Sequence, residues 1–169
     1  MAFLYSLKRL NTKSSFIIFF LTSFLFGISF TVSNISNDLN TIDGVVYRAK
    51  FERIYYFTSR EYWDGMKGFL TFDSGKKDYF FETISFVITR FTNNYHFLFG
   101  LVAMIFSYFS LLSLRYLVNH PKFNNSLSCY ILAYIFCINQ IFNINGLRFW
   151  LAGAIAVFLF LKVFIDRKY

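Results

Sequence analysis

Four long apolar runs dominate the pattern of hydrophobic and polar positions along the chain. They span residues 16–32, 95–114, 127–144 and 149–165, so each holds 17 to 20 residues. A helix needs about 20 apolar residues to cross the hydrocarbon core of a bilayer. The pattern therefore predicts an all-α integral membrane protein with four transmembrane helices. We interpret the first run as a retained anchor, because no small-residue cleavage site of a signal peptide follows it.

The segment between the first two runs, residues 33–94, contains shorter apolar patterns at helical spacing. The first pattern comprises Tyr47, Phe51, Ile54 and Tyr55. Next, Thr58-Ser-Arg-Glu61 has the form of a capping box, which starts a helix. The apolar face of that helix comprises Tyr62, Trp63, Met66, Phe69 and Leu70. A third stripe comprises Phe80, Ile84, Val87, Ile88 and Phe91. We expect these amphipathic helices to lie on a membrane surface; the alternative is a small extracellular domain.

Charges at the ends of the runs predict the orientation of the chain in the membrane. Basic residues precede the first run, separate the second from the third, and follow the fourth: Lys8, Arg9, Lys13, Arg115, Lys122, Arg167 and Lys168. The outer segment, residues 33–94, has eight basic and eight acidic residues, so its net charge is zero. Because basic residues favour the cytoplasmic side, we expect both termini in the cytoplasm. Residues 1–169 then form a single membrane domain with the outer segment outside.

Composition changes this picture little but excludes other classes of protein. Of the 169 residues, 56% are hydrophobic and 24% are aromatic, more than a soluble domain of this size would hide. The net charge is +8, yet the basic residues form no continuous patch, so we expect a lipid bilayer as partner and no nucleic acid. Cys129 and Cys137 are too far apart along one helix for a disulfide, and no cysteine–histidine cluster predicts a metal site. We expect no metal and no cofactor.

Arg148 opens the fourth run and is the first candidate for chemistry. It places a permanent positive charge at the membrane boundary, close to a helix N-terminus whose backbone dipole is also positive. An anion bound between these like charges would make the arrangement favourable, and the forked donors of arginine suit a phosphate. The alternative is an arginine that anchors the helix at the lipid headgroups.

Amides and carboxylates supply the remaining candidates. Asn139 and Asn143 share one face of the third run, and Asn145 lies in the turn before Arg148. Together they would form an outward polar pocket for a sugar–phosphate headgroup, although amides in such helices also bond to neighbouring helices. In the outer segment, Asp43 and Glu82 are candidates for a general base that accepts a hydroxyl proton, or for ion pairing with the arginine.

Three stretches, in this order and register, resemble landmarks of the EpsG family of polytopic bacterial membrane proteins. The stretches are Asp43-Gly-Val-Val-Tyr47, Phe81-Glu82 with the residues up to the second run, and Asn145-Gly-Leu-Arg-Phe-Trp-Leu-Ala-Gly-Ala-Ile155. Members of that family are related in role to Wzy-type O-antigen polymerases. They are considerably longer, with more membrane helices, so the resemblance implies that this chain corresponds to their N-terminal part and is incomplete by itself.

The resemblance implies a multi-pass protein of the bacterial inner membrane that assembles exopolysaccharide or O-antigen. Such proteins join oligosaccharide units carried on polyprenyl pyrophosphate at the outer face of that membrane. By resemblance, Arg148 would hold the pyrophosphate, and Asp43 or Glu82 would orient or deprotonate the acceptor. The expected sugar-binding residues are Asn139, Asn143, Asn145 and Tyr47.

Two alternatives stay open at this point. The chain would otherwise be a non-enzymatic accessory or remnant protein that works with other polysaccharide-assembly proteins, or a small transporter component. The cores of the four runs contain no Asp, Glu, Lys or Arg, which argues against a transporter coupled to ions or protons.

Overall fold

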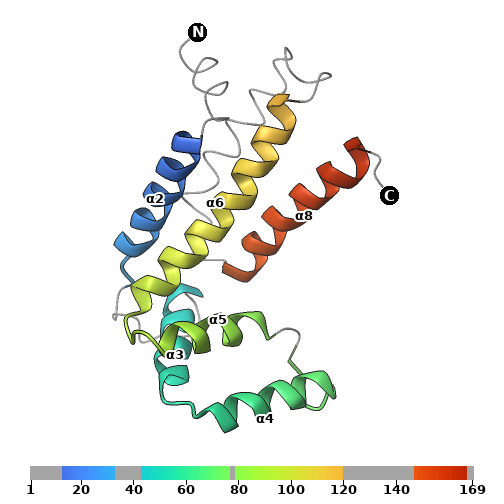
Figure 1. The fold of residues 1–169 in the computed structure, drawn as a ribbon. Coiled ribbons are helices and arrows are strands. Elements are labelled where there is room, and N and C mark those ends of the chain that lie inside the picture. The colour runs from blue at the N-terminus through green and yellow to red at the C-terminus, as the bar shows by residue number, and fades with distance from the viewer. Residues whose placement is uncertain (1–12, 33–42, 77–78, 120–146, 167–169) are drawn as a thin grey trace. The chain divides into compact units, whose positions relative to one another are not determined.

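A computed structural model describes residues 13–32, 43–76, 79–119 and 147–166 of the chain. Within these ranges every regular element is an α-helix, which confirms the predicted all-α class (Figure 1). The helices are α2 (Lys13–Ser29), α3 (Asp43–Tyr55), α4 (Ser59–Leu70), α5 (Phe80–Thr89), α6 (Tyr95–Asn119) and α8 (Leu147–Asp166). The chain divides into two compact units: the first comprises Met1–Ser29 and Gly100–Tyr169, and the second comprises Phe30–Phe99.

One helix in the described part of the chain is long and apolar enough to cross a membrane. Its apolar stretch, Tyr95–Leu117, has 23 residues and belongs to α6. The apolar stretches of α2 and α8, Phe16–Ser29 and Phe149–Val163, are shorter. The predicted third run, residues 127–144, lies outside the described residues. Within the described ranges, helix length and composition therefore support one of the four predicted transmembrane spans, the one in α6.

The helix limits differ from those of the apolar runs. The first run was predicted over residues 16–32, whereas α2 begins three residues earlier and ends at Ser29. The second run was predicted to end at residue 114, whereas α6 continues to Asn119. Polar residues at the end of an apolar run still form helix, because backbone hydrogen bonding does not require an apolar side chain. Hydropathy therefore locates the apolar part of each helix and not its ends.

Within the first unit, α6 lies between α2 and α8 (Figure 1). The ring of Tyr108 meets Phe16 and Phe20 of α2 edge-on, with centroids 5.7 and 6.1 Å apart. On the other side, Phe109 of α6 contacts Phe158 of α8 at 5.9 Å. Aromatic rings in edge-on contact contribute more than the burial of their area alone. These contacts hold the three helices of the unit together.

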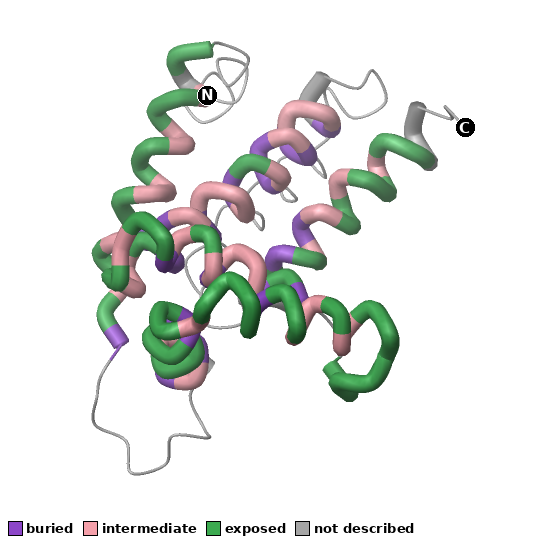
Figure 2. Tube along the Cα trace, turned by 60° about the horizontal axis from the view of Figure 1, so that its bottom comes forward, coloured by how far each residue is buried: buried purple, intermediate pink, exposed green. Residues whose placement is uncertain are grey.

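Small polar residues occupy the buried side of α6 in this unit. Ser107, Ser110 and Ser113 are all buried, and the Ser113 hydroxyl donates to the Phe109 carbonyl at 2.9 Å. Figure 2 shows that much of the surface of α2 and α8 is exposed. The exposed side chains of these two helices include Ile17, Leu21, Leu25, Phe149 and Phe160. Leu111, Leu114 and Leu117 of α6 are buried as well, so the buried side of this helix combines small polar and apolar residues, while large apolar side chains of α2 and α8 are exposed.

The second unit is built on the packing of α3 against α5. Phe51 of α3 is completely buried, and the ring of Tyr47 contacts that of Phe81 at 5.0 Å. Arg48 extends from α3 to the start of α6, where its guanidinium lies 4.5 Å from the centre of the Tyr95 ring. The same side chain donates to the Val32 carbonyl at 3.3 Å. Arg48 thereby ties the segment after α2, helix α3 and the first turn of α6 into one unit.

The capping box at the start of α4 is confirmed. The Glu61 backbone N–H donates to Thr58 Oγ1 at 3.2 Å, and the Thr58 N–H donates to Glu61 Oε2 at 2.7 Å. The apolar face of α4 is narrower than predicted, because Tyr62 is buried whereas Trp63 and Leu70 are exposed. The turn that follows α4 holds Phe72 at a φ of 63° with 92% of its surface exposed. A left-handed phenylalanine is uncommon and costs conformational energy.

The predicted apolar stripe of α5 lies mainly on its exposed face. Phe80, Val87 and Phe91 are exposed, whereas Phe81, Ser85 and Thr89 are buried. The short hydroxyl side chains allow α5 to approach its neighbours closely. Small hydroxyl side chains therefore share the buried face of α5 with Phe81.

Candidate functional site

The predicted site residues fall into three groups in the structure. Asn139, Asn143 and Asn145 lie outside the described residues. Arg148 is the second residue of α8 and Asp43 is the first residue of α3; the backbone of each is described, whereas the side chain is not. The expected position of Arg148 at a helix N-terminus stays a prediction, because the residues before Leu147 lie outside the described ranges. Arg148 belongs to the first unit and the carboxylates to the second, so their predicted pairing stays a prediction.

Glu82 is the predicted site residue whose surroundings are best defined. It lies in the first turn of α5, where the helix dipole favours a negative charge. Lys76 Nζ lies 3.1 Å from Glu82 Oε1, and both side chains retain some exposure. The second oxygen, Oε2, is buried and has no hydrogen-bond partner among the described residues. This oxygen keeps its lone pairs, and a ligand hydroxyl would reach it only after the side chains that cover it move.

Tyr79 packs beside the Glu82 carboxylate and contacts helix α4. Its ring lies 4.7 Å below Lys76 Nζ, and its hydroxyl donates to the Tyr62 carbonyl at 3.3 Å. Burial raises the pKa of the Tyr79 phenol, and the negative charges of Glu82 and of ionised Tyr62 raise it further. The phenol therefore stays neutral and keeps donating its hydrogen bond over a wide range of pH.

The start of α5 is held against α4 by aromatic and hydroxyl contacts. The rings of Tyr62 and Phe86 are stacked, with centroids 4.2 Å apart. The Tyr62 hydroxyl shares a hydrogen bond of 3.0 Å with Thr83 Oγ1, and Thr83 Oγ1 also donates to the Tyr79 carbonyl at 2.8 Å. These contacts fix the first turn of α5 and thereby the position of the Glu82 backbone.

Tyr47 is a buried residue of the α3–α5 contact. Its ring packs on Phe81, which directly precedes Glu82 in the sequence. The structure thus brings two of the predicted site residues to the same region of the second unit. The contact positions the start of α5, whereas the predicted contact of Tyr47 with a sugar stays a prediction.

Two residues of this region were not anticipated from the sequence. Lys76 pairs with Glu82 across six positions and the end of a turn, so helical periodicity does not reveal the pair. Arg48 pairs with Glu52 at 2.8 Å, and this pair has the i,i+4 spacing that sequence reasoning could have used. The contact of Arg48 with Tyr95 spans two helices and carries no local signal.

In the described ranges, no group of three or more His, Cys, Asp or Glu side chains is arranged to hold a metal ion. Comparison of the chain with family models, with curated proteins and with solved structures gave no match.

Proposed function

We propose that the chain is a multi-pass protein of the bacterial inner membrane. In this proposal four transmembrane helices cover residues 16–32, 95–114, 127–144 and 149–165, and the outer segment lies at the external membrane surface. The length of α6 supports the proposal, and so does the outward apolar stripe of α5. Exposed Phe80, Val87 and Phe91 would meet lipid at little cost, whereas in water they would form an unfavourable surface.

We propose further that this protein joins polyprenyl-pyrophosphate-linked oligosaccharide units at the outer face of the membrane. The observation that carries the proposal is the carboxylate of Glu82, which has one oxygen held by Lys76 and one that is buried without a described partner, so an acceptor hydroxyl would reach it after the covering side chains move. That arrangement suits a base that receives the proton of an acceptor hydroxyl. The resemblance to the EpsG family supplies the substrate class.

The reaction we propose is a glycosyl transfer. The oxygen of an acceptor sugar hydroxyl attacks the anomeric carbon of the lipid-linked chain, and its proton passes to Glu82. The bond between that carbon and the pyrophosphate breaks, and polyprenyl pyrophosphate leaves with the electron pair. Arg148, in the first turn of α8, would stabilise the charge that develops on the leaving group. Asn139, Asn143 and Asn145 would bind sugar, and Asp43 would orient the acceptor.

The test uses cells whose surface polysaccharide depends on this chain. Glu82→Gln is expected to stop polymer formation and to leave single lipid-linked units, because an amide cannot take the proton. Lys76→Met removes the ion pair but keeps the carboxylate, so it should still yield polymer. Asp64→Asn, at an exposed carboxylate of α4, is the matched control. Polymer length on gels and the amount of chain in the membrane are measured for each variant.

Normal polymer from Glu82→Gln would overturn the catalytic role of this residue. If the polysaccharide then still required the chain itself, the protein would be an accessory subunit that acts with other polysaccharide-assembly proteins. Loss of polymer from Lys76→Met and Glu82→Gln alike would assign the effect to the ion pair and its structural role.

A further inference from the structure

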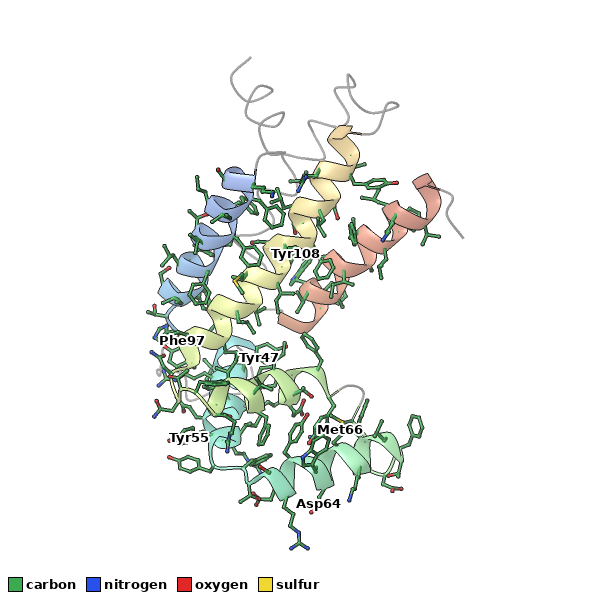
Figure 3. The ribbon with its side chains drawn as sticks, in the orientation of Figure 1. Tyr47, Tyr55, Asp64, Met66, Phe97 and Tyr108 are labelled. Atoms are coloured by element: carbon green, nitrogen blue, oxygen red, sulfur yellow. The ribbon has the colours of Figure 1, made fainter. Side chains whose placement is uncertain are left out.

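The second unit has two adjoining hollows near the C-terminal ends of α3 and α5. The larger is about 560 Å³ in volume and is lined by residues that include Tyr55, Arg90 and Asn93. The smaller is about 410 Å³ and is lined by residues that include Arg53 and Tyr56. Tyr55 and Asn93 line both hollows, so the two hollows adjoin, and we consider them together as one candidate site (Figure 3 labels Tyr55). Neither hollow is lined by Glu82 or Tyr47.

Exposed aromatic rings border the site. Tyr55 and Tyr56 are neighbours in sequence, and their rings meet edge-on at 5.2 Å. Tyr56 is 80% exposed and Tyr55 is 40% exposed. The negative face of an aromatic ring attracts the polarised C–H groups on one face of a sugar ring, and a tyrosine also carries a hydroxyl that bonds to sugar hydroxyls. Exposed tyrosines at the border of a polar hollow are therefore suited to a saccharide.

Arg90 is held in a fixed position at the larger hollow. Its Nη2 donates to the Tyr55 carbonyl at 3.0 Å and to Thr89 Oγ1 at 3.3 Å. Its guanidinium also lies 4.6 Å from the centre of the Phe86 ring. These contacts use part of the donor capacity of a guanidinium, which has five N–H groups. The others remain for a ligand, and a fixed arginine loses little side-chain entropy when it binds one.

The charge around the site is positive. Arg53 adds a second guanidinium at the smaller hollow. Glu52 also lines that hollow, but its carboxylate pairs with Arg48 at 2.8 Å. The two arginines therefore favour a ligand that carries a carboxylate or a phosphate. The Asn93 amide, which lines both hollows, offers both a donor and an acceptor to hydroxyl groups.

We propose that this site, defined by Arg53, Tyr55, Tyr56, Arg90 and Asn93, binds an acidic saccharide. The sugar ring would lie against one of the two tyrosine rings, which meet edge-on. Its hydroxyls would bond to Asn93, and its acidic group would bond to the arginines. A phospholipid headgroup shares the anionic group but needs neither a tyrosine ring nor an amide. The use of the bound saccharide in polymer formation rests on the proposed function, whereas the binding itself does not.

The test measures binding of saccharides to the full chain in nanodiscs of phosphatidylcholine. The probes are immobilised oligosaccharides that carry uronate or phosphate groups, together with neutral oligosaccharides of the same lengths. We expect acidic probes to bind about tenfold more tightly than neutral ones, as for one charge-assisted contact. Arg53→Gln and Tyr56→Ala should each weaken the binding of the acidic probes about tenfold. Arg90→Lys, which keeps the charge but loses the fork, should weaken it as well.

Two exposed positions of the same unit provide matched controls. Arg60→Gln removes an arginine of α4, and Phe72→Ala removes an exposed aromatic ring; neither residue lines the two hollows. Both control variants should bind the acidic probes as the unchanged chain does. Failure of every acidic probe to bind, or equal losses in the site and control variants, would overturn the proposal. Complete competition by phosphatidylglycerol vesicles, with no preference among saccharides, would assign the site to a lipid headgroup and also overturn it.

The outcomes separate this inference from the proposed function. Glu82 lines neither hollow, so Glu82→Gln should retain saccharide binding even where it stops polymer formation. Loss of polymer in Glu82→Gln without any saccharide binding in the unchanged chain would refute the acidic-saccharide site alone. Binding that depends on Arg53 and Tyr56, together with normal polymer from Glu82→Gln, would refute the catalytic proposal alone.

Discussion

The backbone of α4 at Gly65 lies directly against the hydroxyl of Tyr79. A Cβ atom added at Gly65 would overlap that hydroxyl oxygen, and the ring carbon that bears it would be 3.4 Å away. The same hydroxyl donates to the Tyr62 carbonyl of α4. Tyr79 therefore approaches the helix so closely that it reaches a backbone carbonyl, and only a glycine leaves room for this approach.

Gly65→Ala is expected to destabilise the chain by about 1–3 kcal/mol, because the added methyl group displaces a buried phenol. Gly68→Ala is the matched control on the same helix, where the nearest atom would be Ser74 Cβ at 3.8 Å. This control should stabilise the chain by about 0.5–1 kcal/mol through helix propensity. Unfolding of the full chain in detergent, followed by circular dichroism, measures both. Equal stability of the two variants would refute the close contact.

The raised pKa of Tyr79 predicts that stability depends on alkaline pH. The unfolded chain releases this phenol proton near the ordinary value of 10.0, whereas the folded chain holds it to a higher pH. The stabilisation that neutral Tyr79 gives the folded chain is therefore fully present below the unfolded pKa, and it is lost as the pH rises through the folded pKa. Between about pH 9 and pH 11, the free energy of unfolding measured with denaturant should decline less steeply in Tyr79→Phe than in the unchanged chain. Phe72→Ala, which removes an exposed ring but no ionisable group, should keep the original slope.

Ser74 offers a test of the proposed topology. It lies in the exposed turn after α4, within the segment predicted to face outward. A Ser74→Cys variant that lacks Cys129 and Cys137 should react with a membrane-impermeant thiol reagent in cells with a permeable outer membrane. Protection of this cysteine until the inner membrane is broken would place the outer segment on the cytoplasmic side and contradict the topology.

Arg148 offers a test of the anion site. Arg148→Ala should stop polymer formation while the chain is still made, because the leaving pyrophosphate loses its charge partner. Arg148→Lys should recover little, since a lysine lacks the forked donors that bind a phosphate through two hydrogen bonds. Polymer of normal length from Arg148→Ala would rule out this role and favour the anchoring arginine. The readout is polymer length, normalised to the amount of chain in the membrane.

Sequence reasoning predicted local features of the fold well. The capping box of α4 involves residues three positions apart, so its two hydrogen bonds follow from the local sequence. The pattern around Phe51 likewise predicted helix α3, and the apolar run from Tyr95 predicted most of α6. The physical reason is that backbone hydrogen bonds and caps join near neighbours in the chain.

Features that depend on distant residues were not predicted. The periodicity of α5 showed that it is a helix, but the burial of Ser85 and Thr89 depends on how α5 packs within the second unit. The pair of Lys76 with Glu82 depends on the turn before α5. Within the candidate site, the sequence therefore selected Glu82 but gave no information about the neighbours that decide its chemistry.

The outward apolar stripe of α5 has a consequence for every free energy of unfolding measured on this protein. Phe80, Val87 and Phe91 face the surroundings of the folded chain, so the molecules that touch them contribute to the free energy of the folded state. A detergent micelle, a nanodisc and a vesicle present different hydrocarbon to these rings. In the proposed membrane setting, the surrounding amphiphile is a thermodynamic component of the native state, so the free energies of two variants are comparable only in the same amphiphile.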